Sequence, residues 1–125
     1  MNKKKILVVD DETGVTTMTK LSLEKTGQYQ VCVENRATSA LEAAHRFNPD
    51  LILLDITMPE MDGGDVAAQI KADPKLKDTP IVFLTAVVSQ IETGNSELHR
   101  GGQVFLSKPV SIKTLVTCIE QYTVK

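Results

Sequence analysis

Several features that mark particular protein classes are scarce in this sequence. It has only two cysteines among 125 residues. Cys32 and Cys118 have no metal-ligand spacing to each other or to a histidine, so we interpret both as reduced packing residues. The 14 Lys and Arg residues are outnumbered by 16 Asp and Glu residues, which leaves no excess positive charge to hold a nucleic acid backbone.

Long hydrophobic runs are also missing. The longest apolar stretches, such as residues 6–9 and 51–54, have four residues, whereas a membrane-spanning helix needs roughly 20. Met1 and Asn2 are followed by three lysines and a strand-like run, without the apolar region and cleavage site of a signal peptide. We therefore expect a cytoplasmic protein with no membrane association, and the length predicts a single domain over residues 1–125.

Short apolar runs alternate along the chain with segments of helical periodicity. This pattern predicts an α/β fold in which a five-stranded parallel sheet is covered by helices on both faces. Only the second run alternates cleanly between apolar and polar residues, as is typical of an edge strand. The predicted strands are Lys5–Asp10, Tyr29–Glu34, Leu51–Asp55, Ile81–Thr85 and Val104–Ser107.

Helices are predicted between the strands and after the last one. The first has Val15, Met18 and Leu21 at a spacing of three residues, and Gly27 follows as its stop signal. The segment Val88–Arg100 is a weak candidate because a Gly-Asn-Ser run interrupts it, so we expect a short or mobile helix there. The other helices have apolar stripes at Ala40, Leu41, Ala44 and Phe47, at Val66, Ala67 and Ile70, and, after an N-cap at Ser111, at Ile112, Leu115, Val116, Ile119 and Tyr122.

Polar side chains occupy the ends of four predicted strands. In a parallel sheet the C-terminal ends of the strands share one edge, and doubly wound folds bind ligands there, where the strand order reverses. If the order is 2-1-3-4-5, the first and third strands are neighbours about 5 Å apart at that edge. Three carboxylates would then converge, with a lysine reaching in from the side. The residues are Asp10 and Asp11, Asp55, Thr85, and Ser107 with Lys108, which end the first, third, fourth and fifth strands.

Three carboxylates at one edge would repel one another unless a cation lay between them. Mg²⁺ prefers oxygen ligands, keeps several waters, and is usually held by one or two carboxylates and a substrate phosphate. With a nearby lysine, such a site suits phosphoryl transfer, and one of the carboxylates would be the nucleophile.

Each of these residues also has an ordinary structural interpretation. Asp10 and Asp11 could form the turn and N-cap of the first helix, and Asp55 could simply end a strand. Thr85 is a common type of strand residue, and Lys108 could be a solvated loop charge. Taken singly, these interpretations do not explain why groups of complementary chemistry end four strands whose interiors are apolar.

Four motifs at these positions resemble those of a known family. The runs Ile6–Glu12 and Asp55–Gly63, the Thr-Ala pair at 85–86 and the Lys-Pro pair at 108–109 are similar to those of receiver domains. These are the phosphoacceptor domains of bacterial response regulators in two-component phosphorelay signal transduction. This chain resembles the single-domain, chemotaxis-regulator-like type. The resemblance covers nearly the whole chain and implies a flavodoxin-like fold with strand order 2-1-3-4-5.

The resemblance implies a signalling phosphoacceptor and not a turnover enzyme. Asp55 would be the nucleophile that takes a phosphoryl group from the phosphohistidine of a sensor histidine kinase or a phosphotransfer protein. The chain would catalyse only its own phosphotransfer and dephosphorylation, as a phosphoprotein that carries an aspartyl phosphate. Mg²⁺ would be the cofactor: Asp11 would bind it directly and Asp10 through water. The backbone carbonyl of Thr57 would join Asp55 in completing the metal-binding set.

Other residues are implied to respond to the phosphoryl group. Lys108 would pair with one phosphoryl oxygen, and the Thr85 hydroxyl would hydrogen-bond to another. Phe105 resembles the switch aromatic that turns inward when Thr85 moves, while the alternative is an ordinary core phenylalanine. The peptide bond before Pro109 resembles the cis bond of the family, which would aim Lys108 into the site.

The implied switch would reach a surface away from the phosphoryl group. New negative oxygens on Asp55 would draw Thr85 and Lys108 towards them and pull the fourth strand. We predict that this motion alters the face formed by the fourth helix, the fifth strand and the last helix, and that an output partner binds there. No basic helix is present for direct binding to nucleic acid. The chain is expected to be a monomer or a phosphorylation-dependent dimer.

Two other classes share the parallel sheet. A Mg²⁺-dependent phosphohydrolase of the haloacid dehalogenase type needs an Asp-x-Asp run after the first strand, which Asp10-Asp11-Glu12 does not match; steady turnover of a phosphomonoester would support it. A flavin-binding module of the flavodoxin type needs Ser, Thr and Gly donors in the first loop to cradle a phosphate. The three carboxylates would repel that phosphate, and a colourless purified protein would argue further against it.

Overall fold

Over residues 4–85 the chain alternates strands and helices in the order that the sequence predicts. The computed structural model describes residues 3–85, 97–100, 103–108 and 110–123. The strands are β1 (Lys4–Val9), β2 (Tyr29–Glu34), β3 (Leu51–Asp55), β4 (Ile81–Thr85), β5 (Glu97–Arg100) and β6 (Gln103–Ser107), and the helices are α1 (Thr13–Lys25), α2 (Ala40–Phe47), α3 (Gly63–Lys71) and α5 (Ile112–Tyr122). A short 3-10 turn, Ala37–Ser39, precedes α2.

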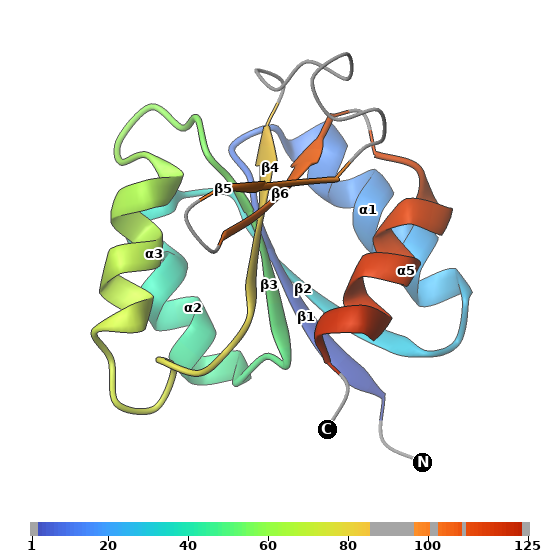
Figure 1. Cartoon of the computed structure of the whole chain (residues 1–125), viewed down its shortest axis with the longest axis horizontal. Coiled ribbons are helices and arrows are strands. Elements are labelled where there is room, and N and C mark those ends of the chain that lie inside the picture. Colours follow the sequence, from blue (N-terminus) through green and yellow to red (C-terminus); the bar gives the residue numbers. More distant parts are fainter. Residues whose placement is uncertain (1–2, 86–96, 101–102, 109, 124–125) are drawn as a thin grey trace.

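The described strands form one sheet in the order β2-β1-β3-β4-β6-β5. The first five are parallel, which confirms the predicted order 2-1-3-4-5 when β6 is counted as the fifth parallel strand. Helices α2 and α3 cover one face and α1 and α5 the other (Figure 1). The carboxyl ends of β1, β3, β4 and β6 therefore meet at one edge of the sheet.

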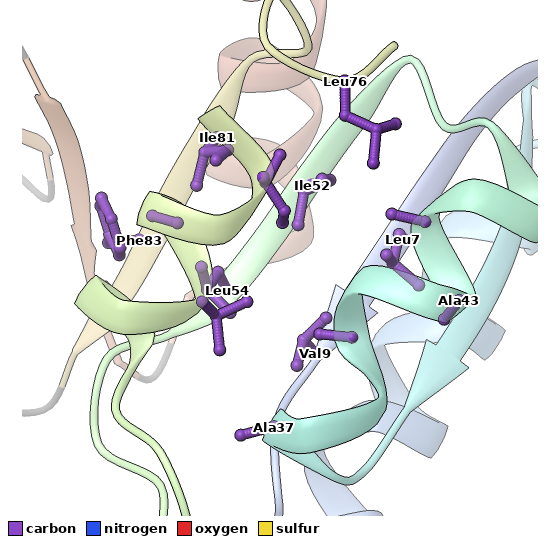
Figure 2. Packing of buried hydrophobic residues seen from close by; sticks show 14 of the residues in the cluster. Leu7, Val9, Ala37, Ala43, Ile52, Leu54, Leu76, Ile81 and Phe83 are labelled. Atoms are coloured by element: carbon purple, nitrogen blue, oxygen red, sulfur yellow. The ribbon is translucent and has the colours of Figure 1, made fainter. Parts of the chain in front are cut away.

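The core consists of two apolar layers, one on each face of the sheet. Successive residues of a strand point to opposite faces, so Leu7 and Val9 pack under α2 and α3, while Ile6 and Val8 pack under α1 and α5. Figure 2 shows the first layer, where Phe83 lies beside the side chains of β3. Because both faces are covered, the central strands are continuously apolar, as the sequence suggested.

Strand β2 is an edge strand, as predicted, and α1 covers part of its outer edge. Val31 directs its backbone groups away from β1. Its N–H donates to Oε2 of Glu24 at 3.0 Å, and its carbonyl accepts from Nζ of Lys20 at 2.8 Å. The two side chains also form an ion pair of 3.0 Å with each other. The i,i+4 pair Lys20–Glu24 on α1 thus binds the N–H and the carbonyl of Val31, two backbone groups that an uncovered strand edge would expose.

The predicted apolar stripe of α1 is wrong. Met18 and Leu21 are 63% and 59% exposed, and the buried residues of the helix are Thr16 and Leu23. Leu23 belongs to the apolar layer on this face of the sheet. Nδ2 of Asn35 donates to Oγ1 of Thr16 at 2.9 Å, and the other end of the helix is tied to β2 as described above. These contacts turn the Thr16 side of the helix towards the sheet.

The prediction of a helix over Val88–Arg100 is wrong for its last four residues, which form β5; residues 88–96 lie outside the described part. Strand β5 pairs antiparallel with β6. Only Gly101 and Gly102 separate the two strands in the sequence. A two-residue Gly-Gly link is typical of antiparallel hairpins, whereas a parallel connection needs a longer crossover.

Two of the described helices begin at a side-chain N-cap, and the one at Ser111 was predicted. Oγ of Ser111 accepts from the N–H of Thr114 at 3.1 Å, so Ser111 is the N-cap of α5. Asp62 is also an N-cap, because its Oδ1 accepts from the N–H of Asp65 at 2.9 Å at the start of α3. Among the described residues, no helix is long and apolar enough to cross a membrane.

Candidate functional site

The structure brings Asp10, Asp11 and Asp55 together at the carboxyl edge of the sheet. One carboxylate oxygen from each lies within 4.8 Å of those of the other two. Asp10 and Asp55 are 0% and 4% exposed, while Asp11 is exposed. Asp10 follows β1 and Asp55 ends β3, and these strands are hydrogen-bonded neighbours, so the strand order itself produces the cluster.

Lys108 reaches into this cluster from the end of β6. Its Nζ lies 2.7 Å from Oδ2 of Asp10 and 3.2 Å from Oδ1 of Asp55. Glu12 is more distant, with Oε1 at 3.7 Å from Nζ. The backbone N–H of Lys108 donates to the carbonyl of Thr85 at 2.9 Å, which holds the start of its side chain beside the end of β4.

Burial and charge shift two pKa values in this cluster. Burial raises the pKa of Asp55, and the carboxylate of Asp10 raises it further, although Lys108 partly opposes both effects. Burial lowers the pKa of Lys108, but its hydrogen bond and charge interactions with Asp10 and Asp55 outweigh burial, so the pKa is raised overall. Lys108 is therefore a permanent cation at neutral pH, set between carboxylates.

Backbone contacts hold the carboxylates in place. Oδ1 of Asp10 accepts from the N–H of Glu12 at 3.0 Å, and the N–H of Thr57 lies 3.4 Å from Oδ1 of Asp55. Nδ2 of Asn35 donates to the carbonyl of Asp10 at 2.8 Å. The sequence interpretation missed Asn35, although its position directly after β2, the neighbour of β1, was an available signal.

The predicted switch residues lie on adjacent strands. Thr85 is buried and pairs in register with Ser107 across β4 and β6. Phe105 is half-buried and stacks on Phe83, with ring centroids 5.1 Å apart and an interplanar angle of 21°. Pro109 and the predicted cis bond before it lie outside the described residues.

The donor set suits a hard divalent cation. Three carboxylates face one lysine, which leaves uncompensated negative charge, and all the nearby acceptors are oxygens. Thr57, whose carbonyl is the predicted fourth protein ligand, lies two residues beyond Asp55. The residues present therefore fit Mg²⁺.

Comparisons with known proteins agree with this geometry. A family model described as "Response regulator receiver domain" matches residues 6–120. The alkaline phosphatase synthesis transcriptional regulatory protein PhoP of Bacillus subtilis is 37% identical over 111 residues, which are 89% of this chain and 44% of that relative. The polar-differentiation response regulator DivK of Brucella ovis is 32% identical over 124 residues, which are 98% of this chain and 97% of that relative.

The fold is similar to that of solved structures as well. The chemotaxis protein CheY4 of Vibrio cholerae superposes with a TM-score of 0.82 at 27% identity, over 97% of this chain and 99% of that one. The chain thus spans less than half the length of PhoP and nearly the whole length of DivK and CheY4.

Proposed function

Because this chain belongs to the response regulator receiver domain family, whose members act as phosphoacceptors, we propose that Asp55 is the residue that accepts the phosphoryl group. The observation that carries the assignment is the environment of its carboxylate. Asp55 ends β3 almost fully buried, with the cation of Lys108 at 3.2 Å and two further carboxylates within reach of a shared cation. The phosphohydrolase and flavin-binding alternatives have no support from the relatives.

The reaction would be a transfer between a donor histidine and Asp55. An oxygen of Asp55 would form a bond to phosphorus as the phosphorus–nitrogen bond of the phosphohistidine breaks, and the ring nitrogen would keep the electron pair. Lys108 would offset the charge on a phosphoryl oxygen, and the hydroxyl of Thr85 would donate to another. Both residues already lie at the ends of the neighbouring strands β6 and β4.

The metal site would be formed by Asp10, Asp11, Asp55 and the carbonyl of Thr57. Bound Mg²⁺ supplies positive charge for the phosphoryl oxygens. The residues themselves hold the donor oxygens in position: Asp10 is fixed by the N–H of Glu12, and Asp55 lies within reach of the N–H of Thr57.

The partners are proposed from the family. The donor would be a sensor histidine kinase or a phosphotransfer protein in the cytoplasm, and an output protein would bind the face that includes β6 and α5. The predicted third part of that face, over residues 88–96, lies outside the described residues. Phe105 would transmit the change, since it lies on β6 and stacks on β4. Removal of the phosphoryl group by water would be the chain's own reaction.

The test is intact mass after incubation with Mg²⁺ and acetyl phosphate, alongside Asp55→Asn and a sample with chelator. One added phosphoryl group that needs Mg²⁺ and is absent from Asp55→Asn is the expected result. An adduct that persists in Asp55→Asn would refute the assignment of the nucleophile. Steady release of phosphate from a phosphomonoester would instead support the phosphohydrolase alternative.

A further inference from the structure

Gly63, the first residue of α3, lies against the main chain of Asp55. A Cβ atom at Gly63 would be 2.5 Å from the carbonyl oxygen of Asp55 and 2.7 Å from Cα of Ile56. Ordinary contacts of a carbon atom are about 3.5 to 4.0 Å, so even one methyl group requires the backbone to move. Gly63 does not have a positive φ. The close approach, and not an unusual backbone conformation, therefore requires glycine here.

Hydrogen bonds on both sides hold the backbone of Ile56. Its N–H donates to the carbonyl of Leu84 on β4 at 3.1 Å, and its carbonyl accepts from the N–H of Gly63 at 2.9 Å. The sheet thus holds this residue from one side and the first turn of α3 from the other. Residues 56–63 form a loop whose two ends are joined by the second of these bonds.

The loop that is closed in this way begins directly after Asp55 and carries the Thr57 carbonyl. Thr57 follows Ile56 directly, and its N–H points towards Oδ1 of Asp55. We propose that Gly63 is a positioning residue for phosphoryl transfer. Because it lacks a side chain, α3 packs directly against the Asp55 backbone, and this contact fixes the positions of the Asp55 carboxylate and the Thr57 carbonyl relative to each other. The inference rests on the proposed function of Asp55 and extends it to a residue that does not touch the phosphoryl group.

Replacement by alanine should displace the reacting group. In Gly63→Ala, the Asp55–Ile56 backbone must retreat by about 1 Å to restore normal contact, and a misplacement of that size costs on the order of 100-fold in rate. We expect the rate of phosphorylation at saturating Mg²⁺ to fall at least about tenfold, and the affinity for Mg²⁺ to fall several-fold.

Two other glycines provide matched controls. A Cβ atom at Gly64, the next residue of the same turn, would meet only Oδ1 of the Asp62 side chain, at 3.2 Å. A Cβ atom at Gly14, near the start of α1, has no atom within 4 Å. Gly64→Ala and Gly14→Ala make the same change in helix propensity, and we expect both to stay within about twofold of the unaltered chain in rate and Mg²⁺ affinity.

The experiment measures three quantities for each variant: the melting temperature, the dissociation constant for Mg²⁺ by calorimetry, and the initial rate of phosphorylation by acetyl phosphate from intact mass. Rate and affinity are measured well below the melting temperature. If Gly63→Ala melts at a lower temperature but its folded form keeps the rate and affinity of the controls, Gly63 is merely structural and the proposal is wrong.

A measurement on the unaltered chain covers the case in which Gly63→Ala does not fold. The backbone amide signals of Gly63 and Ile56 should shift together in an NMR titration with Mg²⁺, and unchanged signals would overturn the proposal. If the unaltered chain takes up no phosphoryl group, the proposed function fails, while Mg²⁺ affinity and the amide shifts still decide the role of Gly63.

Discussion

Nζ of Lys108 lies 2.7 Å from Oδ2 of Asp10, and this ion pair joins two strands, β6 and β1, that are not neighbours in the sheet. The Asp10 side chain is fully buried, and that of Lys108 is 16% exposed. The pair therefore crosses above the ends of β3 and β4, where Asp55 and Thr85 lie. A single cation thus links the ends of three strands, β1, β3 and β6.

Removing this cation should destabilise the fold in a way that depends on pH and metal. Lys108→Met leaves Asp10 and Asp55 buried without their partner, and the loss of one partner of a buried pair costs about 3 to 5 kcal/mol. The pKa of Asp55 is already raised by burial and Asp10, so the carboxyl of the variant protonates more readily. The loss in free energy of unfolding should therefore become smaller as the pH falls. Urea unfolding at pH 5 and pH 7.5, with and without Mg²⁺, measures this.

The exposed Lys113 on α5 provides the control for that measurement. Lys113→Met should change the free energy of unfolding by less than about 0.5 kcal/mol at either pH. Equal losses for Lys108→Met at both pH values would contradict the role of Lys108 in compensating buried carboxylates.

Metal removal should lower thermal stability only while Asp11 is intact. A ligand that binds the folded state stabilises it by about 2.7 kcal/mol at 100 times its dissociation constant. Asp11 is exposed and lies within the carboxylate cluster, so Asp11→Asn should abolish the gain from Mg²⁺ without lowering the melting temperature of the metal-free chain. Melting curves with Mg²⁺ and with chelator measure both effects. The control is Glu42→Gln, on the exposed side of α2, in which Mg²⁺ should raise the melting temperature as much as in the unaltered chain. If Mg²⁺ raises the melting temperature of Asp11→Asn by that full amount, Asp11 is not a ligand.

A second pH effect should come from the opposite end of the sheet. Glu120 accepts a hydrogen bond from the hydroxyl of the buried Tyr29 at 2.6 Å and pairs with Nζ of Lys4 at 3.0 Å. The Tyr29 hydrogen bond, and then Lys4, lower the pKa of Glu120 from its usual 4.5. Since the folded-state pKa lies below the unfolded value, this stabilisation is present above pH 4.5 and is lost as the pH falls through the lowered pKa.

The same pair limits stability at high pH. Burial and the neighbouring carboxylate raise the pKa of Tyr29, so its contribution is complete below the unfolded value of about 10 and is lost as the pH rises from there towards the raised folded-state pKa. Glu120→Gln should cost on the order of 1 kcal/mol at pH 7, because the carboxylate is half exposed, and little at pH 3. Denaturant unfolding of Glu120→Gln, Tyr29→Phe and the double variant measures the coupling energy between the two side chains. If the losses in free energy of unfolding of the two single variants add up to that of the double variant, the hydrogen bond contributes nothing.

The pair that covers the β2 edge should protect against self-association. In the double variant Lys20→Ala, Glu24→Ala, the N–H and carbonyl of Val31 lose their partners, which should cost about 1 to 2 kcal/mol and expose the strand edge. Light scattering and sedimentation should then show more self-association than in the unaltered chain. Glu42 and Arg46 form a pair with the same spacing on α2, at 3.3 Å. Their double alanine variant is the control, and equal behaviour of the two double variants would refute the protective role.

Much of the fold was predictable from sequence because the signals are local. Four-residue apolar runs predict strands buried on both faces, and Ser111 and Gly27 act within a few residues of their own helix ends. The functional edge was predictable for a related reason: in a parallel sheet, residues that end strands share an edge whatever their separation in the sequence. The meeting of Asp10, Asp55 and Lys108 follows from that rule together with the strand order that the resemblance to receiver domains implies.

The rotation of α1 was not predictable in this way. Met18 and Leu21 form the best apolar stripe of the helix, yet they face outwards. Burial of Leu23 in the core and hydrogen bonds from Asn35 and to Val31 hold the other side against the sheet. Periodicity within a helix cannot include partners that lie on another element. The same limit applies to β5, which takes its place by pairing with β6.

The sequence by itself determined which segments form the parallel strands and which side chains end them, since apolar runs and local stop signals set both. The strand order was implied by the resemblance to receiver domains. Only the tertiary structure decided that Lys108 lies closer to Asp10 than to Asp55, and that Gly63 lies against the Asp55 backbone. Those relationships depend on distances of a few tenths of an ångström between elements far apart in the chain, and close packing of the whole domain sets such distances.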